Sequence, residues 1–184
     1  MTLDEHDRRL LRTAALDSID FGLTHRRPMT VNANDYPAAL REEKATFVTL
    51  RHADELLGCI GTLRPHRPLV SDVVHNAYAA AFSDPRFPAL SADQRPDLDL
   101  HISILSALVP LTVRSEDDLL TQLRPGVDGL LLEEGDLAAT FLPAMWPRLP
   151  TPQVFVRALK DKAHLPREYW SPTIRVYRYE VDDV

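Results

Sequence analysis

The sequence predicts an α+β protein, because the order helix, strand, strand, helix, strand can be traced twice along its 184 residues. Hydrophobic residues make up 45% of the chain and charged residues 26%, as in folded globular proteins, which excludes a disordered, coiled-coil or collagen-like chain. Fifteen prolines against six glycines favour short, stiff loops. We expect a single domain over residues 1–184, with two lobes of about 1–110 and 111–184.

Hydrophobic periodicity predicts the elements of the first half. The pattern Thr2 to Glu5 has capping-box spacing and begins a helix whose small and apolar residues recur through Gly22. Alternation predicts a hairpin with its turn at Ala53 and Asp54, and Pro68 begins the next helix. The later segments are strands at 45–52 and 56–63, a helix at 69–82, one helical turn at 91–94 and a strand at 99–105.

The second half predicts the same order. Ser115 caps a helix that ends near Arg124, Gly135 and Asp136 form a hairpin turn, and Thr151 begins another helix. The strands are expected at 129–133, 137–141 and 173–181. The two halves share negligible sequence identity, so duplication rests on element order, and coincidence in an ordinary α+β chain is the alternative.

A long connection over residues 26–44 joins the first helix to the first strand. Loops of this length are uncommon unless they cover or bind something, so we expect it to lie over a cleft. Arg26 and Arg27 beside Pro28 could bind phosphate or be solvated surface cations.

Charge and cysteine content exclude several classes of partner. Twenty-one basic against twenty-seven acidic residues give a net charge of -6, so we do not expect nucleic acid as a partner. No apolar run approaches the roughly 20 residues of a membrane span. A single cysteine, Cys59, and scattered histidines offer no metal-ligand set, and no nucleotide-binding motif is present. We therefore expect a cytoplasmic protein without metal, cofactor or membrane.

The stretch Leu-Gly-Cys-Ile-Gly-Thr at residues 57–62 is the main candidate site. Gly58 and Gly61 weaken a strand unless another group comes close, and we expect a cleft there. Cys59 is either a small packing residue or a nucleophile whose proton passes to His66 or His75. The expected binding residues are Gly58, Gly61, Thr62, Arg64, Arg67, Asp84 and Arg86.

Asp84 and Arg86 belong to a rigid loop between two prolines, Asp-Pro-Arg-Phe-Pro at 84–88. This loop either ends the preceding helix with its own salt bridge or faces an anion. The structural interpretation is favoured, because rigid loops serve architecture as well as binding.

With these two motifs in this order, the chain resembles the AMMECR domain family, known in bacteria as protein A of the AmmeMemoRadiSam system. Four further segments follow in the family order: 47–50, 102–106, 126–130 and 139–143. The resemblance implies an AMMECR-type domain of two repeated units around one curved, barrel-like mixed sheet, with the cysteine motif facing a cleft. One sheet would then hold the strands of Phe47, Ile60, Ile104, Leu131, Phe141 and Val176, with the helices of Val74 and Phe155 in equivalent positions.

The family resemblance also implies partners, a radical S-adenosylmethionine protein and a Memo-like protein. The family usually has arginine where this chain has Leu57, and often histidine where it has Asp128. On a regular strand Leu57 and Cys59 share a face, so we expect a thiol without a neighbouring cation, and Leu57→Arg should restore one. Two hypotheses remain: an accessory or substrate-presenting subunit, and an enzyme that uses Cys59.

Overall fold

The computed structural model describes residues 3–53 and 55–184, and the chain divides into two compact units. The first comprises Met1–Leu105 and Asp182–Val184, and the second comprises Ser106–Val181. The expected lobe boundary near residue 110 thus lies close to the division, but the last three residues return to the first unit. No helix in the described part of the chain is long and apolar enough to cross a membrane.

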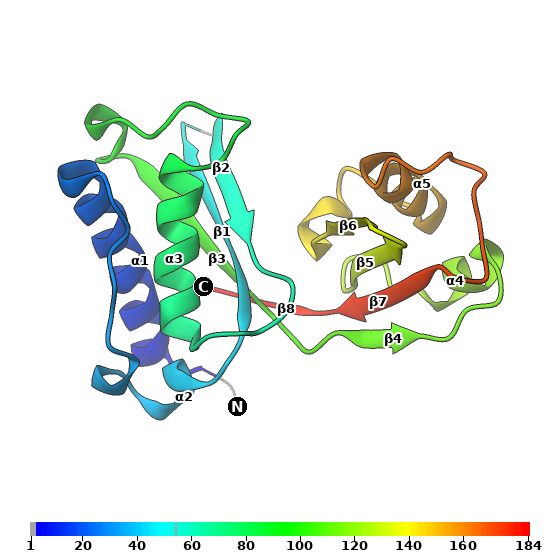
Figure 1. Cartoon of the computed structure of the whole chain (residues 1–184), viewed down its shortest axis with the longest axis horizontal. Coiled ribbons are helices and arrows are strands. Elements are labelled where there is room, and N and C mark those ends of the chain that lie inside the picture. Colours follow the sequence, from blue (N-terminus) through cyan, green and yellow to red (C-terminus); the bar gives the residue numbers. More distant parts are fainter. Residues whose placement is uncertain (1–2, 54) are drawn as a thin grey trace. The chain divides into compact units, whose positions relative to one another are not determined.

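The first unit packs three helices against one face of a four-stranded sheet (Figure 1). Its sheet order is β2-β1-β3-β8. The elements are α1 (Glu5–His25), η1 (Ala33–Asp35), α2 (Ala38–Arg41), β1 (Ala45–His52), β2 (Glu55–Gly61), α3 (Leu69–Phe82), η2 (Ala92–Gln94), β3 (Leu98–Leu105) and β8 (Val181–Asp183).

Alternation along β1 decides which side chains enter the first core. Val48 and Leu50 are fully buried with residues of α1 and α3, whereas Phe47 and Thr49 point to the opposite face. The long connection packs Leu40 and its neighbours against this same core. It therefore covers hydrophobic side chains of its own unit, which corrects the expectation that it lies over a cleft.

The first helix begins at Glu5, later than the expected cap at Thr2 would place it. Asp4 is the N-cap, and its side chain accepts a hydrogen bond from the backbone of Asp7 at 2.8 Å. Thr2 and the turn residue Asp54 lie outside the described residues. The strand at 45–52 and the helix at 69–82 have the expected bounds.

The second unit repeats the order with its own sheet, β4-β7-β5-β6. Its core places Phe155 against Trp146, with the rings stacked at 4.1 Å. The elements are β4 (Val109–Leu111), α4 (Glu116–Gln122), β5 (Gly129–Glu134), β6 (Leu137–Phe141), η3 (Pro143–Met145), α5 (Pro152–Lys162) and β7 (Arg175–Tyr179).

The α+β class is confirmed, but the single barrel-like mixed sheet is wrong. The described strands form two antiparallel four-stranded sheets, and neither closes into a barrel. Two short strands join the sheet of the other repeat. Strand β4 follows β3 in the chain and pairs with β7, whereas β8 follows β7 and pairs with β3. Phe47 and Phe141 therefore belong to different sheets.

Gly58 is the point of closest approach between β2 and α3. A Cβ atom built there would lie 2.0 Å from the carbonyl oxygen of Ala80, which is a backbone atom and cannot turn aside. The space that the sequence assigned to a cleft is therefore filled by α3. Only a glycine lets the strand lie directly on the helix.

We expect Gly58→Ala to lower the free energy of unfolding by about 1–3 kcal/mol, because helix and strand must separate to admit the methyl group. Cys59→Ala, on the other face of the same strand, should cost less than about 1 kcal/mol. Denaturant unfolding followed by circular dichroism measures both, since Trp146 and Trp170 lie in the second unit and do not report on the first. Equal losses would contradict the close contact.

Candidate functional site

Cys59 lies on β2, at the edge of the first sheet. It lies opposite Thr49 of β1, whose hydroxyl donates a hydrogen bond to the sulfur at 3.3 Å. Because Thr49 points away from the helices that cover Val48 and Leu50, the thiol points away from them too. Cys59 is half-buried, so its side chain is partly accessible.

The loop after α3 occupies the unpaired edge of β2 at Cys59. The Cys59 backbone N–H donates to Asp84 Oδ2 at 2.9 Å, and Arg86 Nη2 donates to the Cys59 carbonyl oxygen at 2.9 Å. Arg86 also donates through Nε and Nη2 to the two Asp84 oxygens, at 2.9 and 2.7 Å. Asp84 accepts from the Cys59 N–H and Arg86 donates to the Cys59 carbonyl, so the two side chains replace the hydrogen bonds of a neighbouring strand.

Electrostatics keep this pair ionised. The hydrogen bonds from Arg86, supported by the Cys59 N–H, lower the pKa of Asp84 to about 2 although burial opposes the shift. Asp84 in turn raises the pKa of Arg86, and the Cys59 side chain adds a smaller contribution in the same direction. The loop therefore forms its own salt bridge, as expected, and also brings a guanidinium to the thiol.

Leu57 does not share the face of Cys59. The strand pairing shifts between Leu50 and Arg51, so that Leu57 is an extra residue in a β-bulge, and its side chain packs against the core between sheet and helices. The expectation that Leu57 removes a cation beside the thiol is wrong, because the bulge reverses the alternation. An arginine at position 57 would start from the core side of the sheet.

Thr62 and Arg67 contact α3, whereas Gly61 lies against the Phe47 ring of β1. The buried carboxylate of Asp72 accepts hydrogen bonds from the Thr46 hydroxyl at 2.7 Å and the Thr62 hydroxyl at 2.8 Å. Arg67 Nε lies 2.9 Å from the other Asp72 oxygen as an ion pair. This network joins β1, the end of β2 and the first turn of α3, so its role is to hold the sheet on the helix.

The expected bases lie away from Cys59. His66 is exposed and its Nδ1 lies 3.1 Å from the carbonyl oxygen of Arg64, which is also exposed. His75 is on α3, the helix against the other face of the sheet; burial, with help from Arg67, lowers its pKa. In the described chain, the structure therefore brings together Cys59, Asp84 and Arg86 from the expected set.

Sequence reasoning missed a polar row on the thiol's face. Thr49 lies opposite His101 of β3, and Asp183 Oδ1 lies 2.9 Å from His101 Nε2. Ser103 donates to the same Asp183 oxygen at 2.9 Å. Alternation in β3 could have placed His101 and Ser103 on one face, but only the pairing with β1 and the return of the C-terminus bring them near Thr49.

Asp128, the other departure noted in the sequence, is a structural carboxylate of the second unit. It is fully buried and accepts from the Arg124 backbone at 2.8 Å and from the Arg124 guanidinium at 2.5 Å. The Asp128 carbonyl oxygen accepts from the Trp146 indole at 2.8 Å. Within residues 3–53 and 55–184, no three His, Cys, Asp or Glu side chains are grouped to hold a metal.

Fold and site together define a class of protein. It has two α+β units, and in the first unit the ion pair of the loop after α3 bonds the backbone of the edge strand that carries Gly58 and Cys59. The model of the AMMECR1 family matches residues 13–184, so the chain belongs to the AMMECR1 family. The resemblance noted in the sequence is confirmed.

Individual relatives agree with this assignment. A protein of Methanothermobacter thermautotrophicus is 35% identical over 153 residues, which covers 80% of this chain and 78% of that protein. A protein of Thermotoga maritima is 36% identical over 149 residues, covering 79% of this chain and 80% of its own. The crystal structure of an uncharacterized protein from Pyrococcus horikoshii matches with a TM-score of 0.90 at 25% identity, over 98% of this chain and 92% of that one.

We expect Asp84→Asn to lower the free energy of unfolding by about 1–3 kcal/mol, because a neutral amide cannot hold both Arg86 and the Cys59 N–H as strongly. The folded-state pKa of Asp84, about 2, lies below its ordinary 3.8. Its contribution is therefore present above about pH 4 and is lost as pH falls toward 2. Denaturant unfolding at several pH values measures this slope, which should be smaller in the variant.

Asp20→Asn is the matched control, since Asp20 forms an exposed ion pair with Arg95. It should cost less than about 1 kcal/mol. If the two variants lose the same stability and keep the same acid slope, the anchoring role of Asp84 is wrong.

Proposed function

We propose that this protein is a cytoplasmic accessory or substrate-presenting subunit that binds a small molecule or partner segment against the face of the first sheet carrying Cys59. It works with a radical S-adenosylmethionine protein and a Memo-like protein, the partners that the AMMECR family resemblance implies. The observation that carries the proposal is the Asp84–Arg86 anchor, which holds both backbone groups of Cys59 in place.

A rigid, partly exposed strand suits recognition. The anchored backbone fixes the positions of Cys59 and Thr49, so a ligand on this face meets preorganised groups and orders little on binding. His101 and Asp183 extend the polar surface across the neighbouring strands. Such a surface can orient a bound molecule through hydrogen bonds without transferring a proton.

The alternative is a cysteine-dependent enzyme with Cys59 as nucleophile, and the guanidinium of Arg86 beside the thiol is the observation in its favour. However, Arg86 is engaged by Asp84, so the local pair is neutral. Thr49 donates to the sulfur, and a threonine hydroxyl is not a base at neutral pH. The hydrogen bonds of the described residues thus supply an orienting partner for the thiol but no proton acceptor.

Substitutions of different size at Cys59 separate the two hypotheses. Cys59→Ala removes the thiol and leaves the face open, whereas Cys59→Phe blocks it. We expect the affinity for the purified radical S-adenosylmethionine and Memo-like proteins of the same organism, measured by titration calorimetry, to change less than about threefold in the first and to fall more than about tenfold in the second.

His101→Trp provides a second block, because the exposed His101 side chain lies on the same face and does not touch the thiol. It should reproduce the loss seen with Cys59→Phe, and thermal unfolding checks that each variant is folded. Equal loss in Cys59→Ala and Cys59→Phe would favour the enzyme. Absence of binding of the unmodified protein to either partner would contradict the partner assignment.

A further inference from the structure

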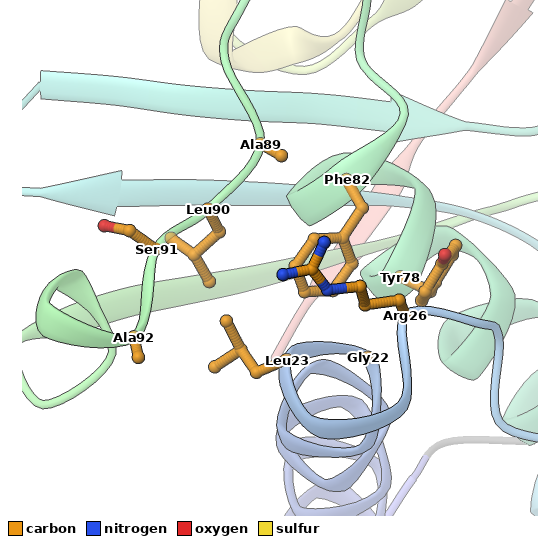
Figure 2. A pocket seen from close by; sticks show the side chains of 9 residues that line it. All are labelled: Gly22, Leu23, Arg26, Tyr78, Phe82, Ala89, Leu90, Ser91 and Ala92. Carbon is orange, nitrogen blue, oxygen red and sulfur yellow. The ribbon is translucent and has the colours of Figure 1, made fainter.

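A second candidate site lies on the helix side of the first unit, where α1 and α3 finish. A groove of about 510 Å³ opens there between the last turn of α1, the last turn of α3 and the segment 89–92 (Figure 2). Leu23, Phe82 and Leu90 supply its apolar surface, and the ring of Tyr78 lies at one side. This volume is within the usual range for small-molecule sites.

The walls of the groove are held in place by bonds within the unit. A Cβ atom at Gly22 would lie 2.3 Å from the Phe82 ring, so the missing side chain lets that ring rest on α1. The Leu90 N–H donates to the Ala81 carbonyl oxygen at 2.8 Å, which ties the segment 89–92 to α3. A ligand would therefore meet a preformed surface.

Arg26 supplies the one charge in the lining. It is the C-cap of α1, with φ at 54°, a backbone conformation that glycine adopts more readily than arginine. Its side chain extends across the mouth of the groove in front of Phe82 (Figure 2). Among the described residues no acidic side chain pairs with it, whereas neighbouring Arg27 lies over the Phe21 ring at 4.8 Å.

We propose that this groove binds a small amphipathic monocarboxylate, with its aromatic or branched apolar group against Phe82 and Leu90 and its carboxylate on the Arg26 guanidinium. An unpaired guanidinium beside an apolar surface suits a ligand that carries one anionic group next to a hydrophobic one. The carbonyl oxygens at the end of α1 carry partial negative charge, which disfavours a doubly charged phosphate relative to a carboxylate. This site is separate from the Cys59 face.

The probes are 1-naphthaleneacetate and its neutral analogue 1-naphthaleneacetamide, which differ in the anionic group alone. We expect saturable binding of the acetate by titration calorimetry, with amide shifts in nitrogen-proton correlation spectra at residues 22–26 and 89–92. The acetamide should bind about tenfold more weakly, because it cannot form the charge-assisted hydrogen bonds.

Arg26→Gln should weaken acetate binding about tenfold, and Arg27→Gln, its matched control, should change it less than about twofold. Ala89→Trp should abolish binding, because Ala89 is exposed and a large ring there fills the groove without entering the core. Equal weakening by the two arginine variants, equal affinity for acetate and acetamide, full binding by Ala89→Trp, or no saturable binding at millimolar concentration would each overturn the proposal.

Discussion

The ion pair between Asp84 and Arg86 is the interaction on which the candidate site depends. An edge strand has backbone groups without a partner strand, and here one carboxylate and one guanidinium take that place at Cys59. The Asp84 side chain is 1% exposed and that of Arg86 is 56% exposed. Burying the acid is costly, and the four hydrogen bonds it accepts from Arg86 and Cys59 offset that cost. Orientation of the thiol is a consequence of this arrangement.

On its other face, the same strand packs closely on α3 because Gly58 has no side chain. Gly58 lets β2 lie on the backbone of α3, and the bulge at Leu57 turns that side chain into the core. One face of β2 is therefore used for packing, and the face with Cys59 and Thr49 is turned away from the helices. In the proposed function, packing uses one face of this short strand and recognition uses the other.

Buried charged side chains with hydrogen-bond or ion-pair partners occur in both units. Asp72 is held by hydroxyl groups and Arg67, Asp128 by Arg124, and the fully buried Lys160 by Glu116 and the carbonyl oxygens of Arg167 and Tyr169. Each of these groups joins segments that are distant in the chain or closes a loop. Arg26 is exposed, lines a groove and has no acidic partner among the described residues.

The sequence by itself determined the local elements and the family, because periodicity and turn residues act over a few neighbouring positions: the strand at 45–52, the helix at 69–82 and the Asp84–Arg86 salt bridge were all predicted. Only the tertiary structure decided which strands share a sheet, since β8 pairs with a strand about eighty residues earlier. It also decided the face of Leu57, because a bulge depends on the partner strand, and it placed His101 beside Thr49. Long-range pairing leaves no local periodic signal, and this is the physical reason that the two sheets and the polar row were not predicted.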